Sequence, residues 1–407
     1  MKVLHTADWH LGQRFLHNER QEEHQRALDW LMSVIRREKI ELLLVAGDVF
    51  DIGNPPNYAR RMYYRFLTQL IGTSCRHIVI TGGNHDSPAM LNAPRELLLA
   101  LNVHVVGEAT ERIEDEIIEL HGAEGQLEAV VAAVPFLRDK DIRQSIAGES
   151  SLERIERIKA GIRQHYRTIG EAVLPYAERG VPLIATGHLF AKGAEAGEHQ
   201  NNIYIGNREN IDGSEFPSIF DYIALGHLHR AQIVNQDYRI HYSGSLIPLS
   251  FSELDDQKVV KIIQFEGRQL VEGVRSVAVR ECRKLRRIGG ELTEVEEKLR
   301  TLHTEISEDE LPAWVEVQVQ TDRLRPNLDG HLRDFAEDLR LVLLKVRTNQ
   351  SYRALDQQVA TLDLDDLSPG EVFRQRCSSA GQAPTELAEL ERTFEELQNW
   401  LQEEEAP

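Results

Sequence analysis

The sequence predicts an α/β protein in which layers of helices stack on a largely parallel sheet, followed by a small α+β unit and C-terminal helices. In the first hundred residues, short apolar runs alternate with amphipathic helical segments, which is typical of repeated strand–helix units. The pattern changes near residue 271, and beyond residue 350 it is helical and strongly acidic. We therefore expect domains at 1–270, 271–350 and 351–407.

Hydrophobic periodicity places the elements of the first domain. Strands are expected at 2–6, 40–46, 77–81, 128–134, 181–186, 222–225, 239–243 and 259–265. Helices are expected at 19–39, 57–70, 88–101 and 151–177. In the second domain, polar and apolar residues alternate over 314–320, which predicts a half-exposed strand, and a helix over 332–339 and a strand over 341–346 follow.

Composition narrows the class of protein. The hydrophobic fraction of 41% is that of a globular chain, and no run of apolar residues is long enough to span a bilayer. The N-terminus does not have the form of a signal peptide. Three widely spaced cysteines without a CxxC pair favour a reducing cytoplasm.

The net charge of −19 argues against broad electrostatic attachment to nucleic acid. The acidic excess is uneven, however. Residues 351–407 hold 13 acidic residues and four arginines, a net of −9, so the other 350 residues carry only −10. This distribution is compatible with local basic patches on the body of the protein.

Polar side chains follow five of the expected strands. The five groups are Asp8-x-His10, Gly47-Asp48, Gly83-Asn84-His85-Asp86, Gly187-His188 and Gly226-His227-x-His229. Each group alone is usually a turn or a cap. Because ligands bind beyond the carboxyl ends of strands in open α/β sheets, five such groups in order predict one shared site.

The residue types in these groups predict a pair of metal ions. Oxygen and imidazole ligands without a thiolate suit Mn²⁺, Fe or Zn²⁺. Two carboxylates, one amide and four imidazoles exceed the needs of one ion, so Asp48 is expected to bridge two. The expected ligands are Asp8, His10, Asp48 and His229 for one ion, and Asp48, Asn84, His188 and His227 for the other.

Two ions roughly 3.5–4 Å apart bind a phosphate between them and activate a water for attack on phosphorus. His85 is then expected to stabilise the pentacovalent phosphate or to protonate the leaving oxygen. Asp86 is expected to orient His85.

These motifs resemble the full set of the calcineurin-like metallophosphoesterases. Further stretches at 5–12, 45–51, 204–206, 221–232, 242–245 and 367–373 are similar to the SbcD family of Mre-type nucleases. The resemblance implies a layered α-β-β-α sandwich with a small α+β capping domain. It also implies Mn²⁺-dependent cleavage of DNA, as a 3′→5′ exonuclease on duplex ends and an endonuclease on single strands and hairpins.

The same resemblance implies a partner, the coiled-coil ATPase SbcC, in a heterotetramer that contains a homodimer of this chain. It implies roles in DNA recombination, replication and repair, in the cytoplasm at the nucleoid. The chain has no Gly-x-x-x-x-Gly-Lys-Ser/Thr loop, so no nucleotide is expected to bind to it and ATP dependence is expected from the partner.

Basic residues are candidates for phosphate contacts, with solvated faces or intramolecular ion pairs as the alternative. They are Arg60, Arg61, Arg65, Arg138, Arg280, Arg283, Lys284, Arg286 and Arg287. The acidic tail carries an apolar stripe that is predicted to bind the base of the SbcC coiled coil, with packing on its own domain as the alternative. The residues are Val372, Phe373, Leu387, Leu390, Phe394, Leu397 and Leu401.

Two other functions stay open. A phosphomonoesterase or cyclic-nucleotide phosphodiesterase would use the same metal site, but the basic run, the second domain and the tail favour a nuclease. A non-catalytic scaffold with this fold would be expected to have lost ligands, whereas the predicted set here is complete.

Overall fold

The computed structural model describes residues 1–143, 148–193, 211–321, 327–350 and 394. Residues 1–319 and 327–347 form one compact unit, and residues 320–326 and 348–407 form a second. The description below concerns the first unit, which holds both the main sheets and a smaller α+β layer.

Two six-stranded sheets make up the larger part of this unit. The first has the order β16-β15-β1-β4-β5-β6, formed by β16 (Gln269–Ala278), β15 (Val259–Glu266), β1 (Lys2–Thr6), β4 (Leu42–Ala46), β5 (His77–Thr81) and β6 (Val103–Val106). The second has the order β13-β14-β12-β9-β8-β7, formed by β13 (Gln232–Ile233), β14 (Ile240–Tyr242), β12 (Tyr222–Gly226), β9 (Leu183–His188), β8 (Leu127–Ala132) and β7 (Ile117–His121).

Four adjacent strands of each sheet are parallel. In the first sheet β1, β4, β5 and β6 pair in parallel, and in the second β8, β9, β12 and β14 do. Their carboxyl ends therefore lie at one edge of each sheet. Apolar side chains between the sheets, such as Leu44, Val131 and Ile184, form a common core.

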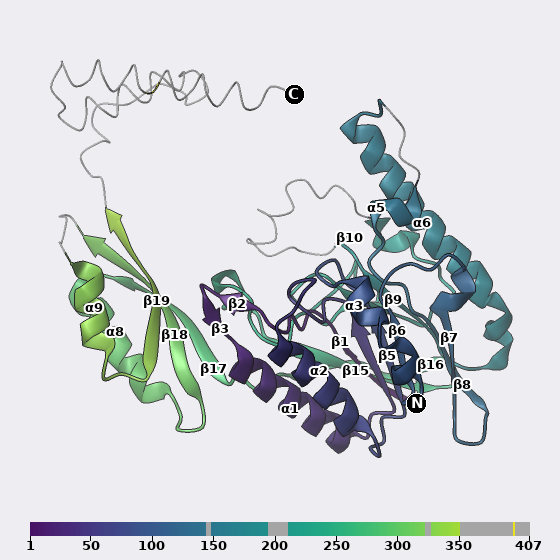
Figure 1. Ribbon diagram of the computed structural model, residues 1–407, viewed down its shortest axis with the longest axis horizontal. Coiled ribbons are helices and arrows are strands. Elements are labelled where there is room, and N and C mark those ends of the chain that lie inside the picture. Colours follow the sequence, from purple (N-terminus) through teal and green to yellow (C-terminus); the bar gives the residue numbers. More distant parts are fainter. Residues whose placement is uncertain (144–147, 194–210, 322–326, 351–393, 395–407) are drawn as a thin grey trace. The chain divides into compact units, whose positions relative to one another are not determined.

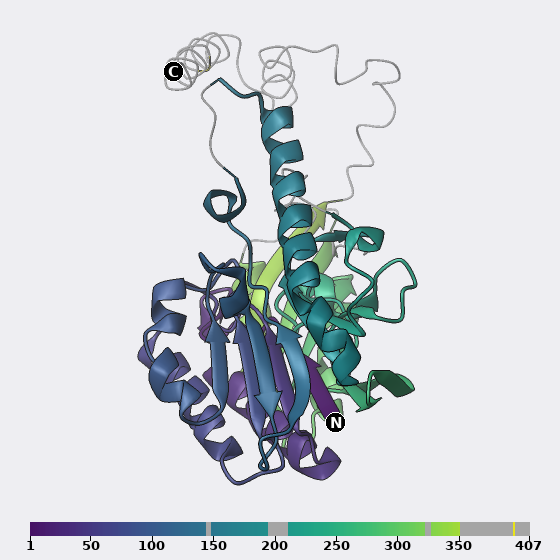
Figure 2. The same cartoon turned by 90° about the vertical axis from the view of Figure 1, so that its right-hand side faces the viewer.

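Helices cover the two outer faces (Figures 1 and 2). α1 (Gln21–Glu38) and α2 (Asn57–Leu70) pack on the first sheet, and the long helix α6 (Ser151–Val173) packs on the second. The expected α-β-β-α sandwich is confirmed. Smaller elements connect these layers: β2 (Arg14–Phe15), β3 (Asn18–Glu19), α3 (Pro88–Asn92), α4 (Arg95–Leu99), η1 (Ile113–Glu116), α5 (Asp139–Ile142), η2 (Leu174–Arg179), β10 (Ala191–Lys192), β11 (Ile211–Asp212), η3 (Gly213–Glu215) and η4 (Phe251–Glu253).

Two expected elements differ in the structure. The helix expected over 88–101 is divided into α3 and α4, because Pro94 has no N–H to continue the helical hydrogen bonds. The boundary expected at residue 270 falls inside β16, which pairs with β15 and extends the first sheet to Ala278.

The smaller α+β layer is a three-stranded sheet in the order β17-β18-β19, with two helices on one face. Its elements are β17 (Arg283–Gly290), α8 (Leu292–Glu305), β18 (Leu311–Thr321), α9 (Leu328–Ala336) and β19 (Leu341–Gln350). β18 was expected to be half exposed, and this holds for only part of the strand, where Gln318 is half-buried and Gln320 is exposed. Trp314 and Glu316, on its polar-patterned face, are 4% and 3% exposed, because Trp314 stacks on Phe15 and Glu316 pairs with two arginines.

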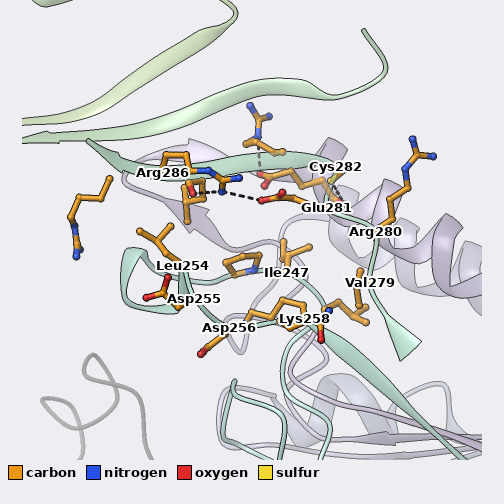
Figure 3. Close-up of a pocket in the computed structure, with 17 residues that line it drawn as sticks. Ile247, Leu254, Asp255, Asp256, Lys258, Val279, Arg280, Glu281, Cys282 and Arg286 are labelled. Carbon is orange, nitrogen blue, oxygen red and sulfur yellow. Dashed lines mark hydrogen bonds and ion pairs between the residues drawn. The ribbon is translucent and has the colours of Figure 1, made fainter. Parts of the chain in front are cut away.

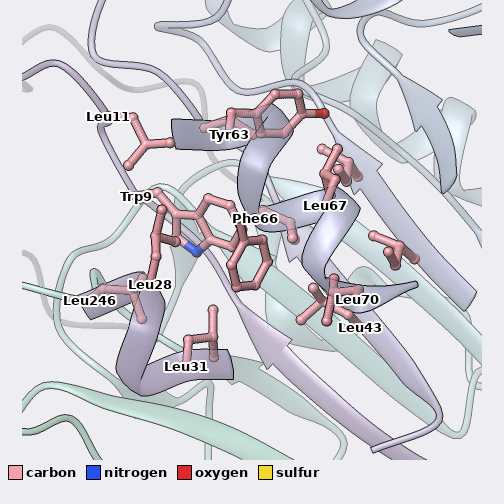
Figure 4. Close-up of a cluster of buried hydrophobic side chains, with 14 of the residues drawn as sticks. Trp9, Leu11, Leu28, Leu31, Leu43, Tyr63, Phe66, Leu67, Leu70 and Leu246 are labelled. Carbon is pink, nitrogen blue, oxygen red and sulfur yellow. The ribbon is translucent and has the colours of Figure 1, made fainter. Parts of the chain in front are cut away.

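Trp9 ties the first predicted ligand loop to the core, since it lies between Asp8 and His10 in sequence. Its indole is fully buried, and its Nε1 donates to the hydroxyl of Thr6 at 2.9 Å. The indole packs edge-on against the ring of Phe66 of α2, with 5.4 Å between the ring centroids. Both belong to a cluster that also contains Leu28 of α1 (Figure 4). Packing of Trp9 therefore fixes the loop on either side of it.

We predict that Trp9→Ala lowers the free energy of unfolding by about 3–5 kcal/mol, because it leaves a large cavity in this core. Trp30→Ala is the matched control, since Trp30 is only partly buried against the same cluster. Chemical denaturation of the metal-free protein measures both. Equal destabilisation by the two changes would contradict the anchoring role of Trp9.

Candidate metal centre

The five groups predicted from the sequence converge at the carboxyl ends of β1, β4, β5, β9 and β12. Asp48 lies at their centre: its Oδ2 is 3.1 Å from Nε2 of His188 and 3.5 Å from Nε2 of His10. Asp48 comes from the first sheet and His188 from the second. The site is thus built across the sandwich and exists only when both sheets are packed together.

The other predicted ligands join the same cluster. Oδ1 of Asn84 is 3.1 Å from Nε2 of His188 and 2.9 Å from Nδ1 of His227. The backbone N–H of His227 donates to Asp8 at 2.9 Å. All seven predicted ligands are therefore brought together, because the ring of His229 also lies 5.1 Å from the ring of His10.

Among the described residues, three groups of donor atoms are close enough to hold a cation, and two of them consist only of predicted ligands. The third is formed by His10, Asp51 and His85. Ligand atoms of Asp8, His10 and His229 lie within 4.8 Å of one another, as do those of Asp8, Asp48 and His188. The first group contains three of the four ligands expected for one ion. The second adds Asp8 to the residues expected for the other.

Unsatisfied buried atoms support a metal ion here. Oδ2 of Asp8 and Nε2 of His10 are buried without a hydrogen-bond partner. Leaving a carboxylate oxygen and an imidazole nitrogen buried and unpaired is costly, so such atoms need an explanation. A divalent cation accepts both, so these donors fit the ions that a metallophosphoesterase fold implies.

Hydrogen bonds to Nδ1 select which imidazole nitrogen faces the site. Nδ1 of His10 contacts Oδ1 of Asp51 at 3.1 Å, and Nδ1 of His188 contacts the carbonyl of Ala46 at 3.0 Å. Nδ1 of His229 contacts Oε1 of Glu253 at 3.2 Å. In these three imidazoles Nε2 is therefore the nitrogen available to a cation, as is common for metal-binding histidines.

The sequence motifs alone assign no role to Asp51 or Glu253. Asp51 is the last residue of the stretch 45–51, which carries part of the family resemblance. Glu253 lies 24 residues after His229 in η4, and no local pattern links the two.

The backbone is strained at four of the predicted ligands. Asp8, His10, Asp48 and His227 have φ of 52°, 46°, 50° and 98°, in the left-handed region that residues with a side chain rarely adopt. Each costs on the order of 1–3 kcal/mol, and such residues cluster at active sites. The strained backbone at these residues thus lowers the stability of the fold but directs their side chains into the site.

Two glycines make the convergence possible. A Cβ on Gly83 would come within 2.1 Å of Oδ1 of Asp48, and a Cβ on Gly47, at φ +85°, would meet His188 at the same distance. Gly83 therefore permits close approach between two loops of the first sheet, and Gly47 permits close approach between the two sheets.

Asp86 does not orient His85, so this expectation is corrected. Its buried carboxylate accepts the backbone N–H groups of Val49, Phe50 and Gly83. It therefore holds the loop that carries Asp48 against the loop that carries Asn84. Nδ1 of His85 instead bonds the carbonyl of Asp51 at 2.8 Å, and His85 is exposed beside the ring of His10.

Buried charges at the site raise two imidazole pKa values. Burial disfavours the charged form of His10, but the carboxylates of Asp51, Asp48 and Asp8 outweigh it and raise its pKa to about 9. Burial likewise opposes protonation of His188, and Asp48 and Asp8 raise the pKa of His188 to about 9. The metal-free site therefore holds protons where metal ions are predicted.

The basic residues expected to contact phosphate divide into two sets. The run after residue 279 is ion-paired within the chain: Arg280 with Asp309, Arg283 with Glu23, Lys284 with Glu310, Arg286 with Glu281 and Arg287 with Glu316. Four of these residues line a pocket of about 570 Å³, where Arg286 points to Glu281 (Figure 3). The structure therefore favours intramolecular ion pairs for this run, the alternative to phosphate contacts.

The remaining basic candidates lie on or near the first sheet. Arg138 donates to the carbonyl of Asp86 at 3.3 Å, and Arg60 donates to Asn57. Arg61 and Arg65 are exposed on α2, and within the part of the chain that the structure describes their side chains have no ion pair or hydrogen bond. The predicted partner-binding residues of the tail lie outside the described residues, apart from Phe394.

Comparisons with known proteins agree with this geometry. Residues 1–231 match the model of the calcineurin-like phosphoesterase family, and residues 281–380 match that of the type 5 capsule protein repressor C-terminal domain. The SbcD subunit of nuclease SbcCD from Escherichia coli K12 is 37% identical over 380 residues, 92% of each chain. The SbcD proteins of Rhodobacter capsulatus and Bacillus subtilis are 36% and 32% identical, over 66% and 65% of this chain and 67% and 66% of theirs.

The class defined by fold and site is the calcineurin-like phosphoesterases. Within this class, the chain belongs to the SbcD family of nuclease subunits. None of the helices among the described residues is long and apolar enough to cross a membrane.

We predict that metal binding to the free protein strengthens as the pH rises. His10 and His188 have raised pKa values, so at pH 7 both hold a proton that must leave before Nε2 can bind a cation. The apparent affinity should rise until about pH 9, with about two protons released per chain near pH 7. Calorimetry of Mn²⁺ binding in buffers of different ionisation enthalpy counts these protons. An affinity that is flat from about pH 6 to pH 9 would contradict this account.

Proposed function

We propose that this chain is a DNA nuclease that hydrolyses phosphodiesters with two divalent ions, most favourably Mn²⁺. The observation that carries the proposal is the position of Asp48, which contacts imidazoles from both candidate ion groups in a buried site. The relatives named as SbcD subunits of a nuclease support phosphodiester cleavage over other reactions of the fold.

Bound ions would supply the positive charge that holds a phosphate and lowers the pKa of a water. The residues of the chain supply everything else. Asp8, Asp48, Asn84 and four histidines fix the donor positions, and Asp51 and Glu253 hold two of those imidazoles. Burial of Asp8, His10 and Asp48 excludes bulk water from the donors.

His85 is the proposed proton donor to the leaving oxygen. Its ring is exposed at the rim of the site, 4.8 Å from the ring of His10. The carbonyl of Asp51 accepts a hydrogen bond from Nδ1, which requires a proton there and leaves Nε2 for proton transfer. The backbone N–H of His85 also donates to Asp48, so its position is tied to the shared carboxylate.

We further propose that the chain works with an ATPase partner, because its relatives are named as one subunit of the two-component nuclease SbcCD. In this proposal, residues 271–350 cap the nuclease domain and the acidic tail binds SbcC in a heterotetramer. The expected activities are 3′→5′ exonuclease action on duplex ends and endonuclease action on single strands and hairpins, in recombination, replication and repair.

We predict that His85→Ala lowers DNA cleavage by about 10²–10⁴-fold while Mn²⁺ binding stays unchanged, because His85 transfers a proton and holds no ion. Cleavage of hairpin DNA in Mn²⁺ measures the first effect, and metal titration measures the second. A parallel assay with para-nitrophenyl phosphate separates a nuclease from a phosphomonoesterase. If the wild type cleaves only the small ester, the nuclease proposal fails.

We predict that neutralising Arg61 and Arg65 together lowers the slope of log affinity against log salt for duplex DNA by about 1.8, if each contacts one phosphate. Both guanidiniums are exposed, and the described residues supply neither with a partner. Arg280→Ala is the control, because Arg280 is paired with Asp309. If the slope changes only in Arg280→Ala, the DNA does not bind at Arg61 and Arg65.

A further inference from the structure

His229 is supported by a connected set of buried contacts. Its Nδ1 lies 3.2 Å from Oε1 of Glu253, a residue of η4 that is 6% exposed. The carboxylate of Glu253 is not free to turn. Its Oε2 accepts the backbone N–H of Leu249 at 3.1 Å, and Ser250 donates to its Oε1 at 3.3 Å.

Lys258 closes this arrangement. Its ammonium group, also buried, lies 2.5 Å from Oε2 of Glu253 and donates to the backbone carbonyl of His229 at 2.9 Å. Lys258 thus holds both the carboxylate that contacts the imidazole and the main chain that carries it. His229, Glu253 and Lys258 thus each contact the other two. The ammonium group of Lys258 neutralises the buried carboxylate of Glu253, which would otherwise be unpaired in the interior.

The two candidate ion groups differ in this respect. In the group of Asp8, His10 and His229, Nδ1 of each histidine contacts a carboxylate. In the group that contains Asp48, Nδ1 of His188 contacts the neutral carbonyl of Ala46. A carboxylate partner makes an imidazole a more basic donor than a carbonyl does, so the groups are expected to differ in affinity.

We propose that Glu253, fixed by Lys258, is a positioning residue that sets the tautomer and direction of His229 and thereby the affinity of one of the two metal sites. The inference rests on the proposed two-ion function. It assigns Glu253 no contact with substrate or ion. Its effect is expected on the ion held by Asp8, His10 and His229 and not on the other.

A purely structural role is the competing explanation, and the chain contains a matched control for it. Glu116 is another fully buried glutamate that contacts a histidine: its Oε2 is 2.8 Å from Nε2 of His165, and its Oε1 accepts the backbone N–H of Thr110. Neither histidine nor glutamate of this second pair belongs to the metal centre. Loss of Glu116 therefore reports what a buried Glu–His contact contributes to stability alone.

The test titrates Mn²⁺ alone into the full-length protein and its variants, and follows the two binding steps by calorimetry and electron paramagnetic resonance. Glu253→Gln keeps an acceptor for Nδ1 but loses the charge. Glu253→Leu combined with Lys258→Met removes both charges, so that no unpaired ammonium group destabilises the fold. Glu116→Gln is the stability control, and thermal unfolding is recorded for each variant.

The expected result is that the double variant weakens one binding step by about 10–100-fold and leaves the other unchanged. Glu253→Gln should weaken the same step by less, and Glu116→Gln should lower Tm without affecting either step. If the double variant binds two ions as the wild type does, or if both steps weaken equally, the positioning role is overturned. If the wild type itself binds no Mn²⁺, it is the proposed function that fails.

Discussion

The site depends on keeping the Asp48 carboxylate charged where water hardly reaches it. Asp48 is 2% exposed, and burial alone would favour its neutral form. The imidazoles of His188 and His10 and the backbone N–H of His85 surround it, and together they hold the pKa of Asp48 well below its usual range. A carboxylate held in this way offers both oxygens to partners on either side.

That requirement explains why the site spans both sheets. Asp8, Asp48 and Asn84 follow strands of the first sheet, whereas His188 and the pair after β12 follow strands of the second. Acidic and basic side chains from opposite layers therefore neutralise one another at the carboxyl edge. Because ions bound there would touch both layers, metal binding and packing of the sandwich are linked.

The cost of this arrangement is visible in the backbone around it. Left-handed conformations at Asp8, His10, Asp48 and His227 persist because the neighbouring structure fixes them. Trp9 anchors one such loop in the core, and the Asp86 carboxylate ties the next one down through three backbone N–H groups. Trp9 is buried and apolar, and Asp86 binds only main-chain N–H groups, so neither competes for the ions.

The smaller α+β layer uses its charges differently. Arg283 lies over the ring of Trp314 and pairs with Glu23 of α1, while Trp314 stacks on Phe15. The basic run thus helps to hold β17 and β18 against the first 23 residues of the chain. The exposed Arg61 and Arg65 of α2, for which the described residues supply no partner, therefore gain importance as contacts for phosphate.

The sequence by itself determined the four inner strands of each main sheet and the residues that follow the strand ends, but not the edge strands β6, β7, β13 and β16. These features are local: a short apolar run marks β1 or β5, and a glycine beside a ligand marks a tight turn. Even the convergence of Asp8, Asp48 and His188 could be expected, since parallel strands end at one edge.

Only the tertiary structure decided which imidazole nitrogen faces the metal site and that Glu253 contacts His229. It also decided that Asp86 binds backbone N–H groups rather than His85, and that Glu316 is buried between two arginines. Each of these depends on a neighbour supplied by a distant segment of the chain. A hydrogen bond or an ion pair is set by the distance between two atoms in the folded protein, and no periodicity along the sequence encodes that distance.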